Sequence, residues 1–129
     1  MATIKSFEEL DSWQKARRLC YEVFKVSSQE PFCRDFALKD QILRASGSVM
    51  DNIAEGFGRG GNKEFVQFLF YAKGSCVEVK SQLYRAKDRG YLNEETFQHI
   101  FQLANEIESI IQGTVNYLKR SGIVGHKFK

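Results

Sequence analysis

Hydrophobic residues recur at steps of three and four along most of the chain, which is the period of an amphipathic α-helix. Four segments of this kind follow one another, over residues 6 to 28, 35 to 58, 62 to 90 and 93 to 122. Each begins at a residue suited to cap a helix: Ser6, which forms a capping box with Glu9, then Asp35, Asn62 and Asn93. The pattern therefore predicts four long helices joined by short connections.

Each predicted helix has one apolar face that we expect to point inward. These faces comprise Leu10, Trp13, Ala16, Cys20, Val23 and Phe24; Leu38, Ile42, Ala45, Val49 and Ile53; Phe65, Leu69, Ala72, Cys76, Val79, Leu83 and Ala86; and Phe97, Ile100, Phe101, Ala104, Ile107, Ile111, Val115 and Leu118. Short connections make successive long helices antiparallel. We predict an all-α fold, an antiparallel up-down-up-down four-helix bundle over residues 1–122, with residues 123–129 as a flexible C-terminal tail.

The join between the second and third segments is rich in glycine. Gly56, Gly58 and Gly61 match the spacing of a dinucleotide-binding loop, but such a loop follows a strand, and the residues before Gly56 have a helical period. We interpret these glycines as the end of one helix and a turn into the next. The tripeptide Arg59 to Gly61, which resembles an RNA-binding repeat, is a single copy and fits the same turn.

The third segment also carries a second apolar face, opposite its predicted core seam. Phe70, Val77 and Tyr84 recur every seven residues, and a helix of an isolated bundle would normally be polar there. We predict a homo-oligomer whose interface is formed by Val66, Phe70, Gly74, Val77, Ser81 and Tyr84. Scattered apolar surface residues, which are common singly, are the alternative.

Polar residues within the apolar pattern suggest a structural network. We predict that Arg44, Asn52, Glu55, Arg59 and Glu78 form it, and that loss of a buried member would leave its partners unsatisfied. A carboxylate enzyme using Glu55 and Glu78 is an alternative. A di-metal bundle needs Glu-x-x-His on two helices, which the chain lacks, and neither histidine suggests a catalytic base. We therefore expect no metal, no cofactor, no catalytic residue and no enzymatic activity.

The net charge is only +3, so the distribution of charge matters more than its sum. Basic residues concentrate in the third segment, where Lys73, Lys80 and Lys87 repeat every seven residues. An oligomer would multiply this stripe into a positive surface suited to phosphate backbones. The predicted contacts with RNA or DNA are Arg59, Lys73, Lys80, Arg85, Lys87, Arg89, Lys127 and Lys129. Solvated lysines bordering an interface are the equal alternative.

Three cysteines, Cys20, Cys33 and Cys76, show neither a metal-binding spacing nor a paired framework. Buried or half-buried free thiols in a reducing compartment are expected. The chain starts without the apolar run of a signal peptide and has no segment typical of a membrane span. We expect a cytoplasmic protein with no membrane partner.

A set of residues spread over positions 7 to 121 carries a family resemblance. It comprises Phe7, Leu10, Trp13, Gln14 and Ala16; Gln41, Arg44 and Ala45; Ser48, Asn52-Ile53-Ala54-Glu55-Gly56 and Arg59; Phe65, Phe68, Leu69, Ala72, Gly74, Ser75 and Glu78; and Gly90-Tyr91. The chain thus resembles the four-helix bundle proteins encoded in intervening sequences of bacterial 23S ribosomal RNA genes. Gly47 and the tail depart from the pattern.

The resemblance implies a compact bundle, commonly a homopentamer, with no recognised enzymatic activity. Proteins of this family are also similar in fold to the accessory variability determinant of diversity-generating retroelements. That protein is a basic pentameric barrel that binds nucleic acid and a reverse transcriptase. As an analogy of fold, it raises RNA, DNA or a reverse transcriptase as partners. The rival role is a structural or protein-interaction module without a nucleic-acid partner.

Overall fold

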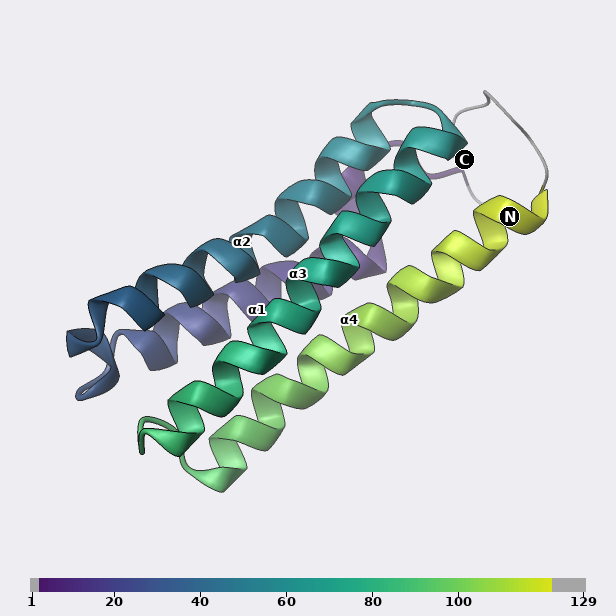
Figure 1. Cartoon of the computed structure of the whole chain (residues 1–129). Helices are drawn as coiled ribbons and strands as arrows, with labels where there is room; N and C mark the ends of the chain where they lie inside the picture. The colour runs from purple at the N-terminus through teal and green to yellow at the C-terminus, as the bar shows by residue number, and fades with distance from the viewer. Residues whose placement is uncertain (1–2, 122–129) are drawn as a thin grey trace.

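The computed structural model describes residues 3–121 and consists of four long helices with two short 3-10 helices. The long helices are α1 (Asp11–Ser27), α2 (Phe36–Gly58), α3 (Asn62–Asp88) and α4 (Glu94–Ser121). The 3-10 helices are η1 (Phe7–Glu9) and η2 (Phe32–Arg34). Successive long helices run antiparallel, as Figure 1 shows. The predicted all-α four-helix bundle is confirmed.

Each long helix packs against two neighbours. The α2–α3 contact is the most extensive, and the α3–α4, α1–α2 and α1–α4 contacts complete the bundle. As a result α1 lies diagonally opposite α3, and the outward faces of these two helices point to different sides of the molecule (Figure 1).

The apolar seams meet in one core, as the sequence pattern predicts for α2 and α3. All the residues assigned to the inward faces of those two helices are buried. The prediction for α1 is partly wrong, because Phe24 is exposed, whereas Leu19 and Val26 are buried. The inward face of α1 is therefore rotated away from Phe24. In α4, Phe101 is only half-buried and Leu103 takes a core position.

Two of the predicted helix caps are confirmed. The Asp35 carboxylate accepts a hydrogen bond from the Leu38 backbone N–H at 3.2 Å, and Asn93 Oδ1 accepts one from the Thr96 N–H at 2.7 Å. Ser6 instead precedes η1, and α1 begins only at Asp11. At the start of α3, Gly61 holds the cap position and Asn62 is the first, buried residue of the helix.

Side-chain contacts join the start of α2 to the connection between α3 and α4. Asp35, at the start of α2, accepts hydrogen bonds from Arg89 Nη1 at 2.7 Å and from the Tyr91 hydroxyl at 2.8 Å. The Tyr91 ring stacks on buried Phe32, with centroids 5.0 Å apart. One carboxylate therefore caps α2 and ties it to the α3–α4 connection.

The predicted glycine turn lies between α2 and α3. Gly60 has a φ of 88°, a left-handed conformation that glycine adopts without a steric cost. Gly56 lies within α2 against α3, and a Cβ added there would lie 2.5 Å from Cβ of Phe68. A Cβ added at Gly47, also in α2, would meet nothing within 4 Å. The two helices therefore approach closely at Gly56 only because it has no side chain.

Gly56→Ala and Gly47→Ala should have opposite effects on stability. Overpacking at Gly56 should lower the free energy of unfolding by about 1–3 kcal/mol. At Gly47 the better helix propensity of alanine should raise it by about 0.5–1 kcal/mol. Urea denaturation followed by helical circular dichroism measures both. Equal effects would contradict the assigned close approach.

Asp35 should make stability depend on pH. The hydrogen bond from Tyr91, with the Leu38 N–H and Arg89, lowers the pKa of its carboxyl below the usual 3.8. A pKa that is lower in the folded than in the unfolded state adds stability that is present above the unfolded pKa and lost as pH falls through the folded one. Tyr91→Phe should raise the Asp35 pKa, measured by NMR titration, and should reduce the loss of stability below about pH 4. An unchanged pKa would refute the role of Tyr91.

Candidate functional site

The outward face of α3 is the most distinctive surface of the bundle. Phe70, Val77 and Tyr84 are 42%, 50% and 51% exposed, although all three are large and apolar. Gly74 and Ser81 lie exposed between them. We call these five residues the α3 outer stripe. Val66, predicted with them, is half-buried against the core instead.

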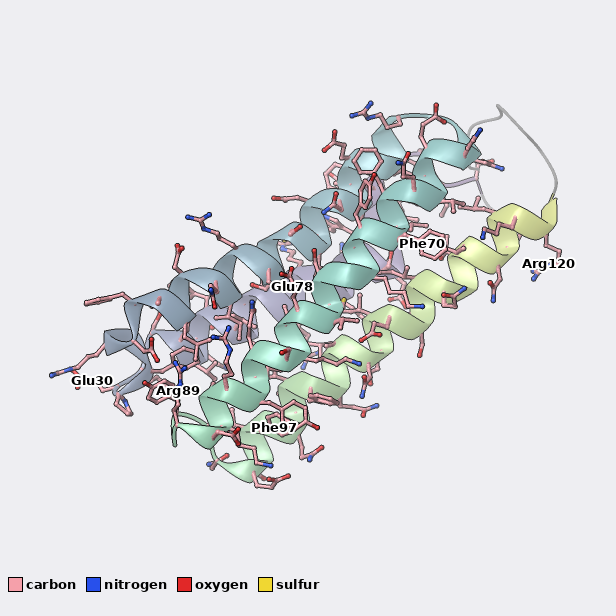
Figure 2. The ribbon with its side chains drawn as sticks, in the orientation of Figure 1. Glu30, Phe70, Glu78, Arg89, Phe97 and Arg120 are labelled. Carbon is pink, nitrogen blue, oxygen red and sulfur yellow. The ribbon has the colours of Figure 1, made fainter. Side chains whose placement is uncertain are left out.

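The α3 outer stripe is continuous with aromatic residues of α4. The ring of Tyr84 lies 5.0 Å from that of Phe97 and 5.5 Å from that of Phe101, measured between centroids. At the other end, Lys119 Nζ lies 5.2 Å from the Phe70 ring. Figure 2 shows Phe70 and Phe97 near opposite ends of the α3–α4 pair. Tyr84 and Phe70, at the two ends of the stripe, therefore pack partly against side chains of α4.

The three heptad-spaced lysines of α3 all reach across to α4. Lys73 donates to Gln112 Oε1 at 2.8 Å, and Lys80 pairs with Glu108 at 2.6 Å and donates to Asn105 at 2.8 Å. Lys87 pairs with Glu94 at 2.6 Å. Charge explains this pairing, since α3 has five basic and three acidic residues (net +2) and α4 has two and four (net −2).

The Lys87–Glu94 pair shifts the pKa values of both residues. The hydrogen bond to Glu94 raises the pKa of Lys87, and the same bond, with one from Gln98, lowers the pKa of Glu94. Both groups therefore stay charged at neutral pH. The ammonium also lies 4.6 Å from the centroid of the Phe97 ring. Lys87 is thus occupied by α4 on two sides.

The predicted phosphate-contacting arginines also have intramolecular partners. Arg59 pairs with Glu55 and Arg89 with Asp35, each at 2.7 Å, and Arg85 donates to Gln41 Oε1 at 2.6 Å. The two remaining predicted contacts, Lys127 and Lys129, lie outside the described residues. The structure therefore places the α3 lysines along one side of the helix, but most of these predicted phosphate contacts are already paired with neighbouring side chains.

The predicted polar network does not form as one unit, which corrects the sequence prediction. Glu55 and Arg59 pair only with each other among its members, and their side chains are about half-exposed. Asn52 donates to the backbone oxygen and the hydroxyl of Ser48, both at 2.9 Å. Arg44 pairs with Asp40. Each of these interactions joins residues four apart within α2 or at its C-terminal cap, so local pairs formed in place of the predicted long-range ones.

Glu78 and Arg44 do share one feature, a polar groove between α2 and α3 of about 510 Å³. Figure 2 shows Glu78 midway along α3. The other lining residues are Gln41, Ala45, Ser48, Ser81, Gln82 and Arg85. Glu78 is exposed and does not converge with Glu55 into a two-carboxylate site. No group of three or more His, Cys, Asp or Glu side chains within residues 3–120 is arranged to hold a metal ion.

All three cysteines are free thiols, two half-buried and one buried. Burial raises the pKa of Cys20 to about 11 and that of Cys76 to about 12, so both are neutral thiols at physiological pH. The Cys20 Sγ donates to the Ser46 backbone oxygen at 3.1 Å. These thiols contribute to packing. None of the described helices carries an apolar run sufficient to cross a lipid bilayer.

Sequence reasoning missed the outward face of α1. Tyr21 and Phe24 are exposed there beside Arg17 and Arg18. The error in the inward face of α1 concealed this cluster, since Phe24 was assigned to the core. A signal did exist, because Arg17, Arg18 and Tyr21 recur at helical spacing.

Comparisons with known proteins agree with this architecture. Residues 8–113 match the model of the family described as 23S rRNA-intervening sequence protein. No curated protein matches the chain. A crystal structure from Bacteroides thetaiotaomicron, of a protein with unknown function from the S23 ribosomal protein family, is similar with a TM-score of 0.74 and 18% identity. The similarity covers 81% of this chain and 95% of that one, and it shows a shared fold.

The Lys80–Glu108 pair should contribute measurably to stability. Its side chains are only 21% and 17% exposed, so water screens their attraction weakly. A double-mutant cycle with Lys80→Ala and Glu108→Ala should give a coupling of about 1–2 kcal/mol from urea denaturation. The control is the Arg44–Asp40 pair, 80% and 61% exposed, which should couple by less than about 0.5 kcal/mol. Equal couplings would contradict the assigned difference.

Proposed function

The chain belongs to the 23S rRNA-intervening sequence protein family, and on that premise we propose that it is a non-enzymatic bundle that assembles with copies of itself through the α3 outer stripe. The observation that carries this proposal is the exposure of Phe70, Val77 and Tyr84 at heptad spacing on a helix already packed on its other side. Water-exposed apolar patches of this kind mark interaction sites.

The residues between the large side chains favour a helix as the contacting element. Gly74 and Ser81 are small and exposed, and a Cβ added at Gly74 would meet nothing within 4 Å. A second helix can therefore approach the α3 backbone between Phe70, Val77 and Tyr84. Rings already held against α4 lose little side-chain freedom on association. The resemblance implies a homopentamer, and that is the stoichiometry we propose.

Non-enzymatic action is part of the proposal. The candidate carboxylates Glu55 and Glu78 do not converge, and Glu55 is engaged by Arg59. The half-buried and buried cysteines with raised pKa values are poor nucleophiles. These observations support an assembly or interaction role over a carboxylate or thiol enzyme.

Phosphate binding by the basic stripe of α3 has less support than self-assembly. Lys80, Lys87, Arg59 and Arg89 each have a carboxylate partner, so a phosphate would have to displace an existing ion pair. The same lysines tie α3 to α4 and thereby keep the α3 outer stripe in place. We propose that this is their main role.

Val77→Glu tests the assembly. Val77 is half-exposed in the single chain, so the substitution should leave helical content unchanged but place a charge in the interface. Light scattering should show an oligomer for the unmodified chain and a smaller particle for Val77→Glu. Gln102→Glu, an equal charge change on exposed α4 surface, should leave the mass unchanged. A single-chain mass for the unmodified protein would refute the proposal.

A further inference from the structure

The outward face of α1 combines exposed aromatic rings with unpaired arginines. Tyr21 is 60% exposed and Phe24 is 56% exposed. Arg17 and Arg18 lie on the same face, and neither has a carboxylate within 4 Å among the described residues. We call these four residues the α1 outer face. Because α1 is diagonal to α3, this face is separate from the α3 outer stripe.

The basic residues of α1 are only partly paired with carboxylates among the described residues. The helix has four basic and two acidic residues, a net +2. Lys15 pairs with Glu106 at 3.8 Å and Lys25 with Glu22 at 3.5 Å, which leaves both arginines available. A surface hollow of about 710 Å³ runs along this helix and is lined by Arg17, Arg18 and Tyr21, with Asp11, Gln14, Lys15 and Glu22. The α1 outer face is therefore open to a ligand.

Arg17 and Tyr21 each take part in a cation–π contact within α1. The Arg17 guanidinium lies 5.8 Å from the Trp13 ring centroid, and the Lys25 ammonium lies 5.3 Å from that of Tyr21. These cation–π contacts limit the freedom of both cations without neutralising them. The Lys25 ammonium, which also pairs with Glu22, therefore lies beside Tyr21, the more exposed of the two rings on this face.

We propose that the α1 outer face binds single-stranded nucleic acid, with Arg17 and Arg18 on phosphates and Tyr21 and Phe24 stacked on bases. Exposed rings with nearby cations are the chemistry that single strands recognise, since every base offers a face for stacking and every linkage a negative charge. A duplex hides its base faces, so it should bind more weakly. Helical rise separates Arg17 from Phe24 by about 10 Å, which is room for about two nucleotides per subunit.

An acidic protein segment could also pair with Arg17 and Arg18, but its carboxylates would not stack on the Tyr21 ring. The rings and the arginines together favour a ligand that alternates negative charge with flat aromatic groups. Single-stranded RNA and single-stranded DNA share this chemistry, and the experiment compares the two.

The test is fluorescence anisotropy on the full chain with labelled single strands of about 12 nucleotides, one polyuridylate and one polythymidylate. In about 50 mM salt, Arg17→Glu/Arg18→Glu should weaken binding at least about tenfold and flatten the slope of log affinity against log salt by about 1.4. The matched control, Lys5→Glu/Lys63→Glu, makes the same charge change at exposed sites and should weaken binding by less than about threefold.

Stacking is tested separately from charge. Tyr21→Ala should weaken binding about fivefold or more, whereas Phe36→Ala, which removes a more exposed ring on α2, should have no effect. A duplex of equal length should bind less tightly than either single strand. If the charge-reversal variant loses helical content, Arg17→Gln/Arg18→Gln takes its place with the same expected direction.

Three results would overturn this proposal: no binding of either single strand at low salt, equal weakening by both charge-reversal variants, or no effect of Tyr21→Ala. The particle mass of each sample, measured alongside, keeps the two proposals apart. A single-chain mass with intact binding would refute assembly alone, and an oligomer that binds neither strand would refute only the role of α1.

Discussion

The close approach of α2 and α3 at Gly56 is the contact on which the rest of the bundle depends. With no side chain at Gly56, Phe68 lies directly against the α2 backbone, and Phe65 packs beside it. The left-handed turn at Gly60 follows immediately, so the direction in which α3 leaves α2 is fixed at its first turns. From that start the buried seam of α3 meets α2 and α4 together, and its opposite side is turned to solvent.

Charge on α3 contributes to this geometry more than to an external surface. The lysines that border its exposed side extend to Gln112, Glu108 and Glu94 on α4. Spaced by seven residues, they make one tie every two turns along the helix pair. A positively charged helix and a negatively charged one thus attract along their whole contact, and a net charge of +3 conceals that arrangement.

The boundaries of α2, α3 and α4, the buried seams of α2 and α3 and the caps at Asp35 and Asn93 could be predicted, because they depend on local spacing and on single side chains. The start of α1 could not, because the residues after Ser6 form a short 3-10 helix before α1 begins at Asp11. The orientation of α1 could not, since Phe24 and Val26 are equally apolar and only packing against α2 and α4 decides which is buried. Ion-pair partners were also beyond reach. Lys80 and Glu108 are far apart in the chain and meet only through the register of two helices. Local pairs such as Glu55–Arg59 pre-empted the predicted network.

The diagonal placement of α1 and α3 has an evolutionary consequence. Among the described residues, the α1 outer face and the α3 outer stripe have no residue in common, and α1 and α3 each pack against α2 and α4. We therefore expect a substitution on one face to leave the packing of the other face unchanged. Selection can retune one surface in a lineage while the other is conserved, so homologues with the same core can diverge in what they contact.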